Sequence, residues 1–245
     1  FCIGDALGVP VEFEPRSKRK EDKVKEMRAY GTYHQYFGTW SDDTSLTLCL
    51  MDSLKNGYNL NDIAYKFVKF YIQKLWTPFG KVFDIGNTIA ISIEQIAMGE
   101  NPLNCGCSKE SDNGNGSLMR VLPLAFYLKK EENLEKIRII EEVSSITHSH
   151  KRSKLACIIY VELAINLLKF RDKKKAYENT VDFIMEHCKN DYEEEFINFE
   201  RVLNKKIYLL KEEEISSSGY VVDSLEASIW CFLKSDSYEE SVFLA

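Results

Sequence analysis

The spacing of the apolar residues constrains the fold of this chain more than any other feature of its sequence. Nearly every apolar stretch repeats at the helical spacing of about 3.6 residues, and alternating stretches that would indicate strands are scarce. Between Asp43 and Lys55, for example, Leu46, Leu50 and Leu54 share one face, and Asn56-Gly57 follows as a left-handed stop. The pattern predicts an all-α fold.

The same spacing predicts a series of helices along the whole chain. Asn61 is the expected N-cap of the second helix, Pro123 predicts a kink or break, and Ser237 with Glu240 forms a capping box before the last helix. No internal repeat or linker-like tract interrupts the series, so residues 1–245 are expected to form one compact domain. The expected ranges are 43–55, 61–75, 88–98, 118–128, 134–146, 155–168, 176–187, 194–210, 221–233 and a helix from 237.

Composition excludes several classes of protein. The 245 residues are 44% hydrophobic, which suffices for a sizeable core. The formal charge of -6 argues against a nucleic-acid partner, and no apolar run approaches the roughly 18 residues of a membrane span. Seven cysteines, an odd number, indicate reduced thiols and predict a cytoplasmic protein. Cys105-Gly106-Cys107 lacks a second cysteine pair, so zinc is not expected.

Two adjacent carboxylates, Asp42 and Asp43, lie between Ser41 and Thr44 at the start of a predicted helix. Taken alone, the segment is best interpreted as an N-cap with acids favoured by the helix dipole. The alternative is a set of oxygen ligands for Mg²⁺ or Mn²⁺, which prefer carboxylates and hydroxyls. Two carboxylates do not neutralise two divalent cations, so a metal site would need further acids, and Glu12 and Asp112 are candidates.

A second polar segment is a glycine-rich turn that enters a helix. The backbone N–H groups of Asn113, Gly114, Asn115, Gly116 and Ser117 would suit phosphate oxygens, although Asn-Gly turns also occur for purely conformational reasons. His148 and His150 follow a helix and would by default form a surface turn.

These segments form an ordered set that resembles the ADP-ribosylglycohydrolase family. That family includes dinitrogenase-reductase-activating glycohydrolases and the ADP-ribosylarginine and ADP-ribosylserine hydrolases, and the resemblance covers almost the whole chain. The motifs are Gly4-Asp5-x-x-Gly8-x-x-x-Glu12, Trp40-Ser41-Asp42-Asp43-Thr44, Gly114-Asn115-Gly116-Ser117-x-Met119-Arg120, Thr147-His148, and Gly219-Tyr220-Val221-Val222-Asp223-Ser224-Leu225-Glu226-Ala227-x-x-Trp230.

The resemblance implies an orthogonal multi-helix domain with a dinuclear Mg²⁺ or Mn²⁺ centre at the mouth of an ADP-ribose cleft. It assigns metal binding to Ser41, Asp42 and Asp43, and catalysis to Glu12 and Asp112. Substrate contacts are implied for Asn113, Gly114, Asn115, Gly116, Ser117, His148 and Tyr220.

One departure from the family pattern concerns the metal centre. Members carry a late Gly-Gly-Asp-x-Asp-Thr motif that completes it, and residues 1–245 lack that motif. The chain begins at Phe1 and stops at Ala245 in a freshly capped helix, so we expect a domain truncated at both ends.

The leading hypothesis is hydrolysis of the glycosidic bond between ADP-ribose and a modified side chain, with arginine as the first expectation. The expected partner is an ADP-ribosylated protein or a small ADP-ribose derivative. The alternative is a catalytically inactive member of the same fold that binds ADP-ribose or has a structural role, like the crystallin-like relatives. The sequence does not indicate an oligomeric state.

Overall fold

The central element of the structure, a computed structural model that describes residues 1–245, is the long helix α9 (Lys151–Phe170). Its side chains are buried around most of its circumference, and such a helix is stable only when other helices cover it. It packs against α7 (Pro123–Leu128), α8 (Asn133–Ser145), α10 (Lys173–His187) and α13 (Val221–Lys234).

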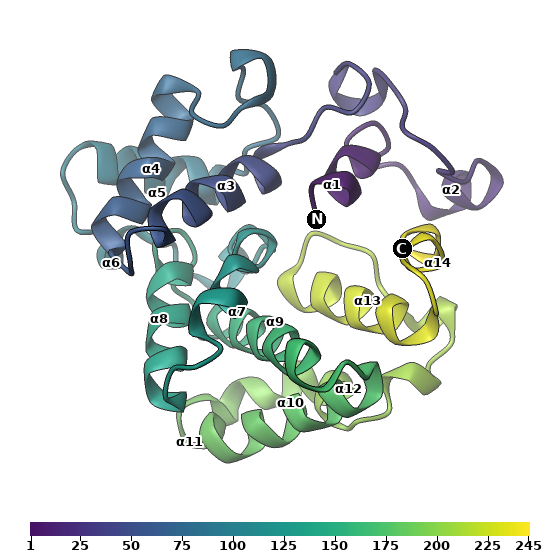
Figure 1. Cartoon of the computed structure of the whole chain (residues 1–245). Coiled ribbons are helices and arrows are strands. Elements are labelled where there is room, and N and C mark those ends of the chain that lie inside the picture. Colours follow the sequence, from purple (N-terminus) through teal and green to yellow (C-terminus); the bar gives the residue numbers. More distant parts are fainter.

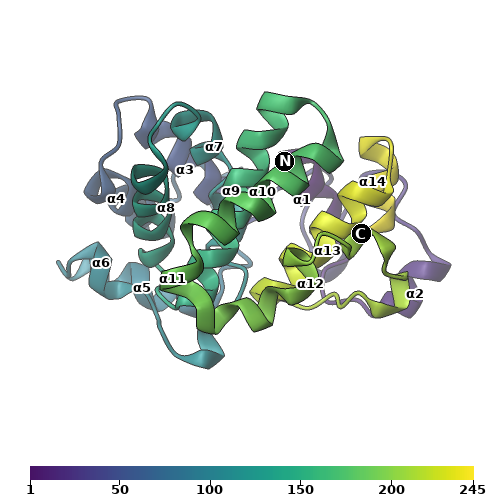
Figure 2. The same cartoon turned by 90° about the horizontal axis from the view of Figure 1, so that it is seen from below.

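Two groups of helices flank this centre (Figures 1 and 2). One group contains α3 (Asp42–Leu54), α4 (Leu60–Gln73), α5 (Asn87–Ala97) and α6 (Pro102–Cys105). The other contains α1 (Cys2–Gly8), α2 (Arg16–Glu21), α13 and α14 (Tyr238–Leu244), and the two chain ends lie near one another in it. The short helices α11 (Lys189–Tyr192) and α12 (Glu200–Leu203) lie between α10 and α13 in the chain. The 3-10 turns are η1 (Gly31–Tyr33), η2 (Pro78–Gly80), η3 (Glu110–Asp112), η4 (Leu118–Arg120), η5 (Glu193–Phe199), η6 (Ile207–Leu209) and η7 (Glu212–Glu214).

The prediction of an all-α fold is confirmed, since the chain forms no strand and only three isolated β-bridges. The break expected at Pro123 is also present, because η4 ends at Arg120 and Pro123 occupies the first turn of α7. Ser237 caps α14 by accepting a hydrogen bond from the Glu240 backbone N–H, whereas the Glu240 carboxylate accepts from the N–H of Asp236.

Two sequence predictions are wrong in detail. The helix expected over 194–210 is divided into η5, α12 and η6, with a left-handed Lys205 (φ 59°) between the last two. The N-cap of α4 is Asn59 and not Asn61, because the Asn59 side chain accepts from the Asp62 N–H. No helix combines the length and apolarity needed to cross a membrane.

Candidate active site

The start of α3 is held by a carboxylate from another helix. Asp5 on α1 accepts hydrogen bonds from the backbone N–H of Ser41 (3.0 Å), the backbone N–H of Thr44 (3.1 Å) and the Thr44 hydroxyl (2.6 Å). The first N–H groups of a helix have no partner within the helix, and a negative charge there is favoured. Asp5 therefore fixes the position of Asp42 and Asp43 relative to α1.

Five carboxyl groups gather around this junction, and we call them the carboxylate cluster: Asp5, Glu12, Asp42, Asp43 and Asp84. Burial raises the pKa of Glu12 to about 8, and repulsion from Asp84 adds to that shift. Burial also raises the pKa of Asp42 and of Asp43 well above the ordinary value, with further contributions from neighbouring carboxylates. Burial raises the pKa of Asp84 as well. Negative charge in the cluster is thus poorly compensated by the protein.

A buried arginine, Arg120, lies close enough to Asp42 for their charges to interact. Arg120 is fully buried, and its guanidinium donates to the carbonyl oxygens of Gly116 (2.5 Å) and Val143 (3.2 Å), while its Nε has no partner. Burial lowers the pKa of Arg120 to about 10, and the charge of Asp42 opposes that shift. Arg120 therefore connects the glycine-rich segment electrostatically with the buried side of the cluster.

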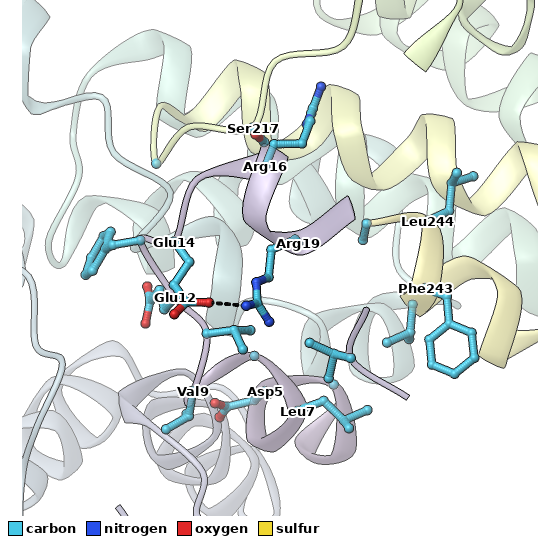
Figure 3. A pocket seen from close by; sticks show the side chains of 18 of the residues that line it. Asp5, Leu7, Val9, Glu12, Glu14, Arg16, Arg19, Ser217, Phe243 and Leu244 are labelled. Atoms are coloured by element: carbon cyan, nitrogen blue, oxygen red, sulfur yellow. Dashed lines mark ion pairs between the residues drawn. The ribbon is translucent and has the colours of Figure 1, made fainter. Parts of the chain in front are cut away.

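The cluster faces a cavity of about 1090 Å³ (Figure 3). Asp5, Glu12, Ser41, Asp43 and Asp84 line it, whereas Asp42 is only 3% exposed and lies outside the lining. Other lining residues come from α2, from the segment before α13 and from α14.

Positive side chains of α2 form another part of the cavity wall. Arg16 donates to the carbonyl of Ile215 (2.7 Å), Lys20 pairs with Glu212 (2.9 Å), and Arg19 pairs with Glu14 (2.7 Å; Figure 3). The contacts of Arg16 and Lys20 attach α2 to the segment that precedes α13, and the pair of Arg19 with Glu14 joins α2 to the loop before it. The cavity consequently has one strongly acidic region and one region of mixed charge.

The glycine-rich segment reaches this cavity through Asn115, which lines it. Its backbone N–H donates to the carbonyl of Gly219 (3.0 Å), and its side-chain amide donates to the Ser224 hydroxyl (3.0 Å). Gly114 forms an isolated bridge with Tyr220. Two motifs about one hundred residues apart in the chain therefore meet at the edge of the cavity.

The other predicted substrate-contact residues lie in or against the glycine-rich segment but outside the cavity lining. Asn113 and Ser117 are buried, and Asn113 accepts from the Ser153 hydroxyl (2.9 Å). His148 is buried, with its Nδ1 2.8 Å from the Thr147 hydroxyl, and burial lowers its pKa to about 3. Tyr220 lies over the Arg152 guanidinium. None of these residues, nor Gly114 or Gly116, lines the cavity.

The structure does not bring Asp112 into the carboxylate cluster. Its carboxylate accepts from the Lys109 N–H (3.0 Å) and the Ser111 hydroxyl (3.2 Å), and it is absent from the cavity lining. Asp112 therefore closes the local turn η3, because its acceptor oxygens are used within that turn.

Sequence reasoning missed Asp84, which lines the cavity together with Glu12. Asp84 precedes α5 with a left-handed backbone (φ 65°), and its carboxylate accepts a hydrogen bond from the Tyr33 hydroxyl. An acid followed by Ile85-Gly86 before a helix looks like an ordinary loop residue. The left-handed backbone and the contact with Tyr33, 51 positions away, are visible only in the structure.

The fit of the cluster to divalent cations rests on its donor chemistry. Carboxylate and hydroxyl oxygens are the ligands that Mg²⁺ and Mn²⁺ prefer, and the mutual repulsion of the carboxylates would be relieved by a cation. No three His, Cys, Asp or Glu side chains already surround one point closely enough to hold an ion. Ser41 acts as the N-cap of α3, accepting from the Asp43 N–H (3.2 Å). The donor set fits a metal centre that needs further ligands.

The fold and the cavity together define an all-α protein with a carboxylate-lined binding site next to a glycine-rich segment. The family model described as ADP-ribosylglycohydrolase matches residues 1–245. The chain belongs to the ADP-ribosylglycohydrolase family.

Two relatives are distant in sequence but match all or nearly all of the chain. The chain is 29% identical over 248 residues to "ADP-ribosylarginine hydrolase Tri1" of Serratia proteamaculans (strain 568), spanning 100% of this chain and 63% of that protein. It is 28% identical over 244 residues to "ADP-ribosyl-[dinitrogen reductase] glycohydrolase" of Rhodospirillum rubrum, spanning 98% of this chain and 73% of that protein. A solved structure titled "ADP-ribosylglycohydrolase-related protein complex" has the same fold, with a TM-score of 0.75 at 24% identity over 100% of this chain and 76% of that one.

Proposed function

We propose that the full-length protein hydrolyses the bond between C1 of ADP-ribose and the guanidino nitrogen of an arginine side chain. The observation that carries the proposal is the meeting of Glu12, Asp43 and Asp84 in one cavity beside Asn115. The relatives whose names specify an ADP-ribosylarginine or ADP-ribosyl-dinitrogen-reductase substrate support the choice of linkage. The expected partner is an ADP-ribosylated protein or a small ADP-ribose derivative.

Ser41, Asp42 and Asp43 would hold Mg²⁺ or Mn²⁺ ions. Bound there, the ions would position the ribose hydroxyls and polarise the attacking water. The family's late Gly-Gly-Asp-x-Asp-Thr motif, which residues 1–245 do not contain, would supply the remaining ligands in the full-length protein.

Glu12 is the proposed acid–base group. Its pKa of about 8 lies near neutral pH, where a carboxyl group exchanges protons efficiently. Its carboxylate would accept a proton from water as the water oxygen bonds to C1, and would return the proton to the guanidino nitrogen as the C1–N bond breaks. Nearby carboxylates would stabilise the positive charge that develops at C1.

Turnover of ADP-ribosylarginine by the full-length protein with Mn²⁺ or Mg²⁺, followed as released ADP-ribose, tests the proposal. Glu12→Gln should lower kcat by about 10²- to 10⁴-fold because the proton acceptor is lost. Glu186→Gln, which changes an exposed carboxylate on α10, is the control and should retain wild-type kcat. ADP-ribose binding without release from any ADP-ribosylated substrate would instead identify the inactive binding protein that the sequence left open.

A further inference from the structure

An exposed group of aromatic side chains borders the acidic region of the cavity. We call it the aromatic rim, and it consists of Phe13, Tyr30, Tyr36, Phe37 and Phe79. Their exposed fractions are 82%, 59%, 66%, 67% and 68%, respectively. Single exposed aromatic residues are ordinary, but a contiguous apolar patch on a folded domain usually marks a binding surface.

The rim is assembled from three separate parts of the chain. Tyr36 lies at its centre, with its ring centroid 6.4 Å from that of Tyr30 and 5.6 Å from that of Phe79. The ring of Phe13 lies 6.4 Å from that of Tyr33. Tertiary structure thus brings Phe79 to Tyr36 and Tyr30, whereas Phe13 contacts Tyr33 and Phe37 follows Tyr36 in the chain.

The backbone that presents the rim is strained. Phe13 (φ 61°), Tyr30 (φ 67°) and Phe79 (φ 55°) all adopt left-handed conformations, which destabilise a bulky residue by roughly 1 kcal/mol or more. Gly31 fixes the neighbouring backbone against Pro10, since an added Cβ would lie 1.9 Å from the Pro10 carbonyl oxygen. Aromatic residues held outward at such a cost are typical of functional surfaces.

The rim reaches the cavity through one of its members, Phe13. Phe13 directly follows Glu12 and itself lines the cavity. Tyr33 contacts Phe13 on one side and donates its hydroxyl hydrogen to Asp84 on the other. A molecule whose reacting bond lies at Glu12 and Asp84 would therefore extend over the rim as it leaves the cavity.

The charge around the rim favours a cation. The chain carries no lysine or arginine from Ala29 to Asp43, and Phe13 lines the same cavity as Glu12, Asp43 and Asp84. Aromatic faces attract guanidinium groups, by about 0.5–1 kcal/mol at exposed sites and more when water is excluded. An arginine-containing peptide segment would match both the rings and the charge.

We propose that the aromatic rim binds the polypeptide that flanks the modified arginine, so that the protein selects arginine-rich segments of a protein substrate. This inference rests on the proposed function and deepens it, because it concerns the part of the substrate outside ADP-ribose.

Steady-state kinetics on two substrates tests the rim. One is free ADP-ribosylarginine, and the other is a peptide in which an ADP-ribosylated arginine has arginine neighbours. The variants Tyr36→Ser and Phe37→Ser should each raise KM for the peptide several-fold, and together about tenfold, with kcat unchanged. Neither KM nor kcat for free ADP-ribosylarginine should change. Phe126→Ser on α7, a control at another exposed phenylalanine, should leave both substrates unaffected.

Each other outcome overturns the inference. An unchanged peptide KM in the double variant, with its Tm preserved, would show that the rim does not bind the peptide. An equal rise in KM for both substrates would show that the rim binds the ADP-ribose half. If the wild-type protein hydrolyses neither substrate, the proposed function fails and the rim inference fails with it, whereas activity with unchanged selectivity rejects the rim alone.

Discussion

Environment gives the aspartates of the carboxylate cluster different roles. Asp5 is surrounded by donors, the N–H groups of Ser41 and Thr44 and the Thr44 hydroxyl, so its charge is used to join two helices. Asp43 contributes its carboxylate to the cavity wall, where burial and neighbouring carboxylates raise its pKa. Identical side chains therefore serve as anchor or as potential ligand according to the number of donors around them.

Gly116 packs so closely that a methyl group has no room. An added Cβ would lie 2.8 Å from both the His148 ring and the Ile89 side chain. We expect Gly116→Ala to destabilise the fold by about 1–3 kcal/mol, as overpacking does, and to raise KM for ADP-ribosylarginine by displacing the glycine-rich segment. Gly86→Ala, where an added Cβ meets nothing within 4 Å, is the control. Urea unfolding and KM of both variants provide the measurement, and equal stability of the two would contradict the prediction.

His148 makes the folded state sensitive to acid. Its pKa is lowered to about 3 in the folded state, by burial first and then by Arg120, against 6.5 ordinarily. The unfolded chain therefore binds a proton that the folded chain does not. The stabilisation is complete above about pH 6.5 and is lost as the pH falls towards 3.

The variant His148→Gln tests this linkage, because glutamine does not titrate. Between pH 7 and pH 5, wild-type protein should lose about 2 kcal/mol more unfolding free energy than His148→Gln does. Denaturant unfolding at the two pH values gives the comparison, and parallel losses in the two proteins would argue that His148 has the same pKa in the folded and unfolded states.

At the scale of helices, a buried ion pair positions the glycine-rich segment. Arg152 in the first turn of α9 donates to Glu195 of η5 (2.7 Å) and pairs with Glu110 of η3, the turn that precedes Asn113. Both Arg152 and Glu195 are 8% exposed. Three elements are thereby joined immediately behind the segment that reaches the cavity.

Removing one partner of this pair leaves a buried charge. We expect Arg152→Met to lower the free energy of unfolding by about 3 kcal/mol or more, and the double variant with Glu195→Met to recover part of that loss. Arg138→Met, at an exposed arginine that pairs with Glu135 and Glu142, should change it by less than about 1 kcal/mol. A double-mutant cycle with no recovery would show that the pair contributes through packing alone.

The same ion pair explains why sequence reasoning failed over 194–210. The apolar residues there fit a helical spacing, but Glu195 turns towards Arg152 and Phe199 enters the core. The left-handed Lys205 then separates α12 from η6. Tertiary contacts overrode a local pattern, whereas Pro123 broke its helix as expected because its effect is local and steric.

For the whole molecule, the sequence predicted the fold class and part of the site. The ordered motifs indicated that Glu12, Ser41 and Asp43 would converge, and all three line one cavity. Asp112 was expected there because the family resemblance assigns it to catalysis, yet its carboxylate is used within its own turn. Asp84 was not predicted because its position depends on Tyr33 and on a left-handed backbone, neither of which leaves a pattern in the sequence.

Repulsion within the carboxylate cluster should lower the stability of the metal-free protein. Neutralising Asp43 relieves repulsion among buried carboxylates, so Asp43→Asn should raise the Tm of the metal-free full-length protein. Mn²⁺ at about 100 times its Kd should stabilise the wild type by about 2.7 kcal/mol, a rise of several degrees in Tm, because it binds only the folded state.

The same substitution at Asp43 should raise the metal-free Tm and abolish the rise in Tm that Mn²⁺ causes. Asp43→Asn should gain stability without metal and lose the Mn²⁺-dependent rise, whereas Asp182→Asn, at an exposed carboxylate on α10, should keep that rise. Differential scanning fluorimetry with and without Mn²⁺ measures both. A lower metal-free Tm together with an intact Mn²⁺ response would mean that Asp43 is a structural helix cap, since a cap contributes stability whether or not a cation is present.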